Sequence, residues 1–146
     1  MTYSVLLEMS YRANEKDIDT LTRTVWVEAR GEPDEGKAAV AHVVNNRAKS
    51  GNTYGQGIDG VCRKDQQFSC WNKNDVNYKK INELDSNSQE YQNTRGIVKK
   101  VLDNEIPDNT NGSKHYHRTD VPHDWAQGKK PAKKIGEHSF YNDIDD

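Results

Sequence analysis

Two stretches with helical periodicity, joined by a very short connection, constrain the fold of this chain most. Residues 17–29 carry acidic side chains in their opening turn and a glycine just past their end, which predicts a first helix. Residues 33–49 begin with Pro33 and stop before a Ser-Gly pair, which predicts a second helix with proline at its first position. Because the second helix is rich in alanine, the two helices can pack closely, so we expect the connection at 30–32 to be held rigidly.

Glu28 ends the first helical pattern and is the best candidate for catalysis. At 3.6 residues per turn it shares a face with Leu21 and Val25, and Ile18 lies close beside them. A carboxyl group partly withdrawn from water has a pKa above its usual value of about 4.3, so it can hold and donate a proton near neutral pH. The alternative is a structural glutamate that turns to solvent or pairs with Arg30.

Length and composition favour one domain, at 1–146, with a modest core. The chain has 146 residues, enough to build a core of its own. Hydrophobic residues make up 32% of it and the mean hydropathy is -1.10, so we expect a small core and long polar loops. The 21 basic and 23 acidic residues are interspersed, which argues against a nucleic-acid partner. A lysine cluster at 129–134 is typical of a solvated face.

The N-terminus and the cysteines bear on the compartment of the chain. The first apolar run is interrupted at Glu8, short of the roughly 7 to 15 residues of a signal-peptide core, and no segment has the length and apolarity to span a membrane. We therefore expect synthesis in the cytoplasm without a signal peptide, and no stable membrane insertion. Cys62 and Cys70 either bridge a short loop, which would contribute about 2 to 3 kcal/mol, or stay reduced.

The remaining elements are predicted to be shorter. Residues 51–77 are rich in Gly, Asn, Asp and Gln with little periodicity, which predicts a long structured loop region with one short strand or turn. A third helix is predicted at 88–103, with Ser86 and Gln89 at the spacing of a capping box and with Tyr91, Thr94, Val98 and Val101 on one face. Two extended segments follow, at 114–118 and 134–141.

A His-Tyr-His sequence lies in the first extended segment. In a strand, His115 and His117 point to one face and Tyr116 to the other. Two histidines on one face are the start of a zinc site, for which the candidate third ligands are His42, His123, His138, Cys62 and Cys70. No HExxH pattern or closely spaced cysteine pair is present, so histidines that form hydrogen bonds along a polar cleft, with no metal, are the favoured interpretation.

Several loop residues suit carbohydrate recognition. Trp71 and Trp125 lie beside Gly, Asn and Pro, where an aromatic ring either stacks on a sugar or anchors its loop. Gln67 and Ser69 offer amide and hydroxyl groups to a sugar or a peptide. Each of these signals is weak when taken alone.

Carboxylates are the best chemical candidates, because the chain has no nucleophile elbow and no Walker or Rossmann glycine pattern. Two carboxyl groups about 5 to 9.5 Å apart would support ordinary glycoside hydrolysis. The acids that follow Glu28 are Glu32, Asp34 and Glu35. Their positions at the start of a helix favour solvated charges that interact with the helix dipole.

The motifs above occur in the order found in a known family. They are Val25–Gly36, Ala41–Arg47, Gln67–Cys70, Gly112–His117, Trp125–Ala126 and Ile135–Tyr141. Together they resemble the SleB-like cell wall hydrolases, which include spore-cortex-lytic enzymes and related phage and bacterial proteins, over nearly all of residues 21–141. Val27, where family members often have Gly, and Lys114, where Thr is common, depart from the pattern and bear on cleft shape and substrate preference.

The resemblance implies a lysozyme-related α+β fold, mainly helical with a short antiparallel β element, that acts on peptidoglycan glycan strands. Glu28 matches the family's catalytic glutamate. In lytic transglycosylase members one acid protonates the glycosidic oxygen after N-acetylmuramic acid and then acts as base toward that sugar's C6 hydroxyl, without a cofactor. The residues expected to bind substrate are Glu32, Gln67, Ser69, His115, Tyr116, His117, Trp125 and Tyr141.

The expected role is that of a monomeric catalytic domain, with a short N-terminal extension and an acidic C-terminal tail around the family region. A phage endolysin that reaches the wall through a membrane lesion fits best, and a wall-remodelling enzyme delivered by a particle or a noncanonical export route fits second. Three alternatives stay open: an N-acetylmuramoyl-L-alanine amidase, an ordinary muramidase, and a catalytically inactive peptidoglycan-binding module.

Overall fold

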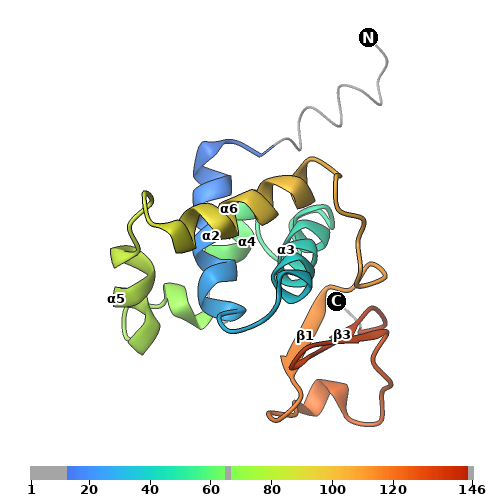
Figure 1. The fold of residues 1–146 in the computed structure, drawn as a ribbon. Helices are drawn as coiled ribbons and strands as arrows, with labels where there is room; N and C mark the ends of the chain where they lie inside the picture. The colour runs from blue at the N-terminus through green and yellow to red at the C-terminus, as the bar shows by residue number, and fades with distance from the viewer. Residues whose placement is uncertain (1–12, 65–66, 145–146) are drawn as a thin grey trace.

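A computed structural model describes residues 13–64 and 67–144 (Figure 1). The helices form one body, and the strands lie together at one side of it (Figure 1). This mainly helical arrangement with a small antiparallel sheet confirms the predicted α+β class. The first twelve residues of the predicted N-terminal extension and the end of the acidic tail, 145–146, lie outside the described residues. Within the described ranges, no helix combines the length and the apolar character needed to cross a bilayer.

The helical body contains α-helices and a short 3-10 turn. They are α2 (Glu15–Glu28), α3 (Asp34–Ala48), α4 (Gly57–Arg63), η1 (Ser69–Trp71), α5 (Val76–Glu83) and α6 (Gln89–Leu102). A further 3-10 turn, η2 (Asp124–Ala126), lies in the connection between β1 and β2, beside the sheet. Helix α2 begins two residues before its predicted start because Asn14 caps it: the Asn14 side chain accepts from the Asp17 amide at 2.8 Å, and the Asp17 side chain accepts from the Asn14 amide at 3.0 Å. Pro33, predicted as the first residue of the second helix, is instead its N-cap with an extended ψ of 168°.

The prediction of a loop region at 51–77 is wrong where α4 and the first residues of α5 form. In α4, Ile58, Val61 and Cys62 are buried, and the helix packs on α2 and α3. This packing stabilises a helix whose glycines give little helical propensity. Helix α5 was not predicted because Ile81 is its one fully buried residue, which leaves no apolar stripe to detect.

The prediction of a helix at 88–103 is confirmed by α6. Its predicted apolar face is buried and consists of Tyr91, Thr94, Val98 and Val101. The predicted cap at Ser86 is wrong, because the chain still turns between Asp85 and Ser88, whose backbone amide donates to the Asp85 carbonyl at 2.9 Å. Ser88 is the N-cap, and its hydroxyl accepts from the Tyr91 amide at 3.1 Å.

The strands form one antiparallel sheet in the order β1-β3-β2. They are β1 (His115–Arg118), β2 (Lys133–Ile135) and β3 (His138–Tyr141). The predicted extended segment at 134–141 is therefore a hairpin and not a single strand, because Gly136 turns the chain with a φ of +57°. Tyr116 of β1 pairs opposite Phe140 of β3, which fixes the register next to the helical body.

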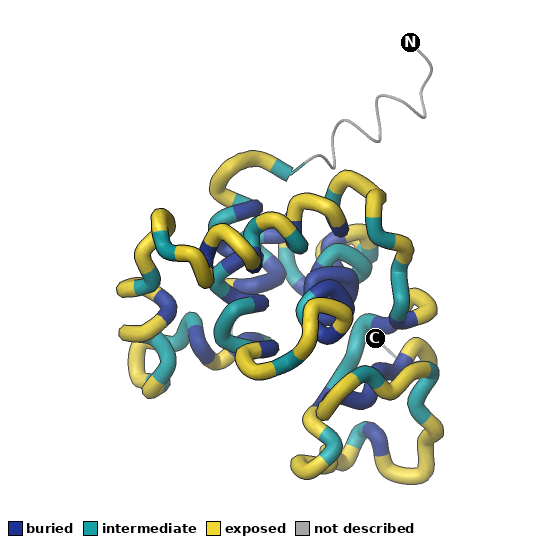
Figure 2. Tube along the Cα trace, viewed as in Figure 1, coloured by how far each residue is buried: buried dark blue, intermediate teal, exposed yellow. Residues whose placement is uncertain are grey.

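The core runs along the alanine-rich helix α3, whose buried trace is visible in Figure 2. A second, smaller cluster joins Ala39 and Val43 of α3 to Phe140 of β3, and all three are fully buried. Tyr116 packs against this cluster. The sheet is thus attached to α3, and the strand that carries Tyr116 faces the end of α2.

Candidate active site

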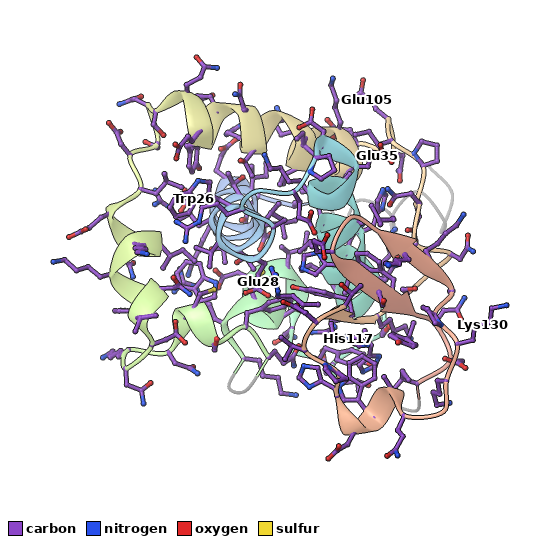
Figure 3. All side chains as sticks on the ribbon, turned by 60° about the horizontal axis from the view of Figure 1, so that its bottom comes forward. Trp26, Glu28, Glu35, Glu105, His117 and Lys130 are labelled. Atoms are coloured by element: carbon purple, nitrogen blue, oxygen red, sulfur yellow. The ribbon has the colours of Figure 1, made fainter. Side chains whose placement is uncertain are left out.

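Glu28 is the last residue of α2 and lies where the helical body meets the sheet (Figure 3). Val25, one turn earlier on the same face, is fully buried, so the predicted apolar face is present. Glu28 itself is half-buried, and the Tyr116 hydroxyl donates a 2.5 Å hydrogen bond to its Oε1 atom. Arg30, the alternative partner considered above, stacks over the Trp26 ring at 5.0 Å from its centroid.

The surroundings of Glu28 favour its protonated form. Burial raises the pKa of Glu28 and nearby Asp75 adds to this, while the Tyr116 hydrogen bond and the Arg47 charge lower it. The net direction is upward, as the sequence predicted. Burial and the Glu28 carboxyl also raise the pKa of Tyr116 well above its ordinary value, so Tyr116 keeps its proton and remains the donor. The second oxygen of Glu28 is left to exchange a proton with a bound molecule.

A cavity of about 870 Å³ opens beside Glu28. The structure brings six of the predicted site residues together on its lining: Glu28, Gln67, His115, Tyr116, His117 and Trp125. These residues come from α2, from β1, from η2 and from the connection before η1, and Figure 3 shows Glu28 and His117 on facing elements. A cavity of this size suits a small polar ligand or a short stretch of polymer.

His117 is fixed in one orientation by two hydrogen bonds. Its Nδ1 atom lies 2.6 Å from the carbonyl oxygen of Arg118, and its Nε2 atom lies 2.9 Å from the hydroxyl of Tyr141. Because a carbonyl only accepts, Nδ1 carries the hydrogen, and Nε2 of the neutral ring accepts from Tyr141. His117 therefore presents a fixed ring to the cavity.

Trp125 provides an aromatic wall of the cavity. Exposed His123 stacks on its ring at 5.7 Å between centroids and an angle of 18°, and half-exposed Val121 lines the same cavity. A partly exposed indole on the wall of a cavity suits contact with the face of a sugar ring. Trp71 has the anchoring role instead, because its indole N–H donates to the hydroxyl of Thr24 at 2.8 Å.

Arg47 of α3 is a cavity residue that the sequence did not single out. Only 9% of it is exposed, and it donates to the carbonyl of Lys114 at 2.6 Å and to Gln67 Oε1 at 3.1 Å. Gln67 in turn donates to the Tyr54 carbonyl at 2.8 Å. The predicted residue Gln67 is thus held in place by Arg47. The signal available in the sequence was an arginine that closely follows the mostly apolar run at 38–44.

Three of the residues expected to bind substrate, Glu32, Ser69 and Tyr141, lie off the cavity lining. Ser69 is exposed at the start of η1, whose next residue, Cys70, is the one that turns inward. Tyr141 is buried, with its hydroxyl on His117. Glu32 has a side chain only 9% exposed, and its Oε1 atom accepts from the Glu137 amide at 2.9 Å.

The described parts of the chain contain no group of three His, Cys, Asp or Glu side chains placed to hold a metal ion. Cys62 and Cys70, for which a bridge and a reduced state were both considered, are buried free thiols. Burial raises the pKa of the Cys62 thiol to about 12. A protonated, buried thiol is a poor nucleophile, which argues against a nucleophilic role for either cysteine.

Known proteins resemble this chain in sequence. A family described as Cell Wall Hydrolase matches residues 31–141, a range that begins three residues after Glu28. The chain is 28% identical over 130 residues to a spore cortex-lytic enzyme of Halalkalibacterium halodurans. The match covers 88% of this chain and 36% of that protein, so the chain spans little more than a third of the length of this relative.

Solved structures resemble it in fold. The catalytic domain of the Bacillus cereus SleB protein matches with a TM-score of 0.70 and 25% identity, over 88% of this chain and 91% of that one. The catalytic domain of the germination-specific lytic transglycosylase SleB from Bacillus anthracis matches with a TM-score of 0.70 and 25% identity, over 89% and 97%. Since the family match covers most of the sequence, this chain belongs to the cell wall hydrolase family, and its fold is that of the SleB catalytic domains.

Proposed function

We propose that this protein cleaves the glycan strands of bacterial peptidoglycan as a lytic transglycosylase, with Glu28 as its catalytic residue. The observation that carries the proposal is the Glu28 carboxyl itself, which faces the cavity with a raised pKa and one oxygen held by Tyr116. The names of its relatives, a spore cortex-lytic enzyme and a lytic transglycosylase, support the same reaction class.

In the proposed reaction Glu28 acts first as acid and then as base. Protonated Glu28 donates to the glycosidic oxygen after N-acetylmuramic acid, and the bond from this oxygen to the C1 atom of muramic acid breaks. The Tyr116 hydroxyl stabilises the carboxylate that forms, because its hydrogen bond favours the charged state. Glu28 then takes the proton of the sugar's own C6 hydroxyl as that oxygen bonds to C1, which gives a 1,6-anhydro end and restores the acid.

The choice of a transglycosylase over an ordinary muramidase rests on the number of carboxylates. Among the described residues that line the cavity, Glu28 is the one carboxylate. Ordinary hydrolysis uses a second carboxyl group as nucleophile or as base toward water, at about 5 to 9.5 Å from the first. Asp75 acts on the pKa of Glu28 without lining the cavity, so it is the residue to test if water proves to be the acceptor.

We propose that the cavity binds the glycan through Gln67, His115, His117 and Trp125. Gln67 and His117 are held by hydrogen bonds from Arg47 and Tyr141, so their polar groups are oriented before a substrate arrives. Trp125 offers a ring face for one sugar. Direct contacts of Glu32, Ser69 and Tyr141 with substrate receive less support, because these side chains lie off the cavity lining.

Mass spectrometry of a digest of purified sacculi tests the proposal. We expect glycan fragments that end in 1,6-anhydro-muramic acid. Reducing muramic acid ends would identify a hydrolase, and free peptides with intact glycan strands would identify an amidase, and either result would contradict the proposal. Binding to sacculi without any release of soluble fragments would identify an inactive binding module.

A metal ion has no part in the proposed reaction. Treatment with a chelator should therefore leave the rate of sacculus digestion unchanged. Activity that disappears with the chelator and returns with added zinc would contradict this, and would give His115 and His117 the role of ligands.

The biological role we propose is that of a phage endolysin, in keeping with the resemblance to a family that includes phage proteins. A culture that expresses the protein should keep its turbidity until the inner membrane is permeabilised, and should then clear. Clearing without permeabilisation would favour a wall-remodelling enzyme that reaches the wall by its own export route.

A further inference from the structure

The carboxylate of Glu32 lies against the turn between β2 and β3. Its Oε1 atom accepts from the Glu137 amide at 2.9 Å and lies 3.2 Å from Nδ1 of buried His138. A Cβ atom on Gly136 would stand 2.6 Å from Glu32 Oε2, so the turn approaches the carboxylate as closely as a glycine allows. The Glu32 side chain therefore fastens the hairpin to the connection between α2 and α3.

The same hairpin positions Tyr116. The His138 ring meets the Tyr116 ring edge-on at 5.1 Å between centroids, and Phe140 stacks on Tyr116 at 5.6 Å. Strand β3 pairs with β1 in the register that puts Tyr116 opposite Phe140. A displacement of the hairpin would thus move the Tyr116 hydroxyl, which hydrogen-bonds to Glu28.

Glu32 and Glu28 are themselves held at a fixed spacing. The Glu32 amide donates to the carbonyl of Ala29 at 3.0 Å, which closes a tight turn directly after the end of α2. One end of this turn carries the carboxyl of Glu28, and the other end carries the carboxylate that binds the hairpin. Glu28 is therefore connected to the hairpin twice: through the turn and the Glu32 carboxylate, and through the hydrogen bond from Tyr116.

We propose that Glu32 is a positioning residue for the reaction: it fastens the β2–β3 hairpin to the end of α2 and thereby keeps Tyr116 hydrogen-bonded to Glu28. The inference rests on the proposed function, since it assumes that Glu28 is the proton donor. It assigns Glu32 an indirect role, through Tyr116, in place of contact with substrate.

The proposal makes the pKa of Glu28 depend on Glu32. The groups that act on this pKa are Tyr116 from β1, Arg47 from α3 and Asp75 at the start of α5. Tyr116 is the member of this set that bonds to Glu28, and its bond lowers the pKa. Loss of Glu32 should release Tyr116 and so raise the Glu28 pKa further, while Arg47 and Asp75 stay in place.

A double-mutant cycle with Glu32→Ala and Tyr116→Phe tests this inference. The readouts are the pKa of the Glu28 carboxyl, from a carbon-13 NMR titration of labelled protein, and the rate and half-saturation on soluble glycan strands. We expect each single variant to raise the pKa of Glu28 and to reduce the maximal rate by roughly tenfold, the size of effect that one hydrogen bond to a charged group supports. The half-saturating concentration should change little.

The double variant should be no worse than Tyr116→Phe alone, because Glu32 acts through the hydroxyl that is already absent. Rate losses that multiply to about a hundredfold, or a Glu28 pKa that does not move in Glu32→Ala, would overturn the inference. If Glu32→Ala does not fold, Glu32→Met serves the same cycle with the same outcomes, because methionine keeps a side chain of similar length but has no carboxylate to accept from the Glu137 amide.

Two controls separate this inference from the proposed function. Glu35→Ala removes an exposed glutamate at the start of α3, apart from Glu28 in Figure 3, and should leave the pKa of Glu28 and the rate unchanged. Glu28→Gln should be inactive. An active Glu28→Gln variant would contradict the proposed function itself. An inactive Glu28→Gln variant, together with rate losses that multiply in the double-mutant cycle, would contradict only the positioning role of Glu32.

Discussion

At the scale of single residues, the raised pKa of Glu28 links its chemistry to stability. The folded protein holds this proton more tightly than the unfolded chain, so the associated stability is complete below about pH 4.5 and is lost as the pH rises through the folded-state pKa. Glu28→Gln removes this loss of stability at higher pH, because the amide does not titrate. Urea unfolding of both proteins between pH 4 and 8 should show the variant gaining in relative stability with pH, and a difference that does not vary with pH would contradict the assignment.

The hydrogen bonds of buried Arg47 should contribute to the stability of the fold. Arg47→Met keeps an apolar stem but leaves the Lys114 carbonyl and Gln67 Oε1 without this donor, so we expect a loss of about 3 kcal/mol in the free energy of unfolding. Arg118→Met is the matched control, because that exposed side chain should have no measurable effect. Equal results for the two variants in urea unfolding would show that the Arg47 bonds contribute little.

At the scale of elements, the cap of α6 gives a direct test. Ser88→Ala removes the side-chain acceptor of the Tyr91 amide and should lower the free energy of unfolding by about 1 kcal/mol. Ser86→Ala, at the position predicted from the sequence, should change it by less than about 0.5 kcal/mol. Thermal unfolding of the two variants decides between the positions, and a larger loss for Ser86→Ala would contradict the structure.

The sequence predicted the elements that have a strong periodic pattern of apolar residues. Helices α2, α3 and α6 carry apolar faces over three or more turns, and their existence was predicted correctly. Helices α4 and α5 have seven and eight residues and few buried side chains, so tertiary packing decides their structure. The hairpin was missed because its turn has a single glycine as its signal, at Gly136.

The site residues that a local sequence pattern marks were predictable, and the contacts between distant residues were not. Glu28 was predictable because it continues an apolar helical face, and Tyr116 because its neighbours in the chain form a recognisable motif. The partnership between Glu28 and Tyr116 was not, because it joins residues that are 88 positions apart. The contacts of Arg47 and Glu32 were missed for the same reason. Arg47 donates to the carbonyl of Lys114, just before β1, and Glu32 accepts from the amide of Glu137, in the turn between β2 and β3, and only the folded chain brings these groups near.

At the scale of the whole molecule, the two thiols report on global unfolding. Cys62 and Cys70 are buried in the core, and burial raises the pKa of both. A thiol reagent such as Ellman's should therefore react with neither residue in the native protein and with both in guanidinium chloride. Rapid labelling under native conditions would mean that the region around α4 opens independently of the rest.

The central claim is that Glu28 transfers the proton that breaks the glycan strand. Glu28→Gln keeps the shape of the side chain and can still accept from Tyr116, so the fold and the binding to sacculi should remain. Turnover should fall by a factor of roughly 10² to 10⁴, because an amide cannot donate the proton. The most direct measurement compares the release of soluble muropeptides from sacculi by the wild-type protein and by Glu28→Gln, with sacculus pull-down as the measure of binding. We predict unchanged binding with release reduced to background, and release at the wild-type rate would contradict the proposed role of Glu28.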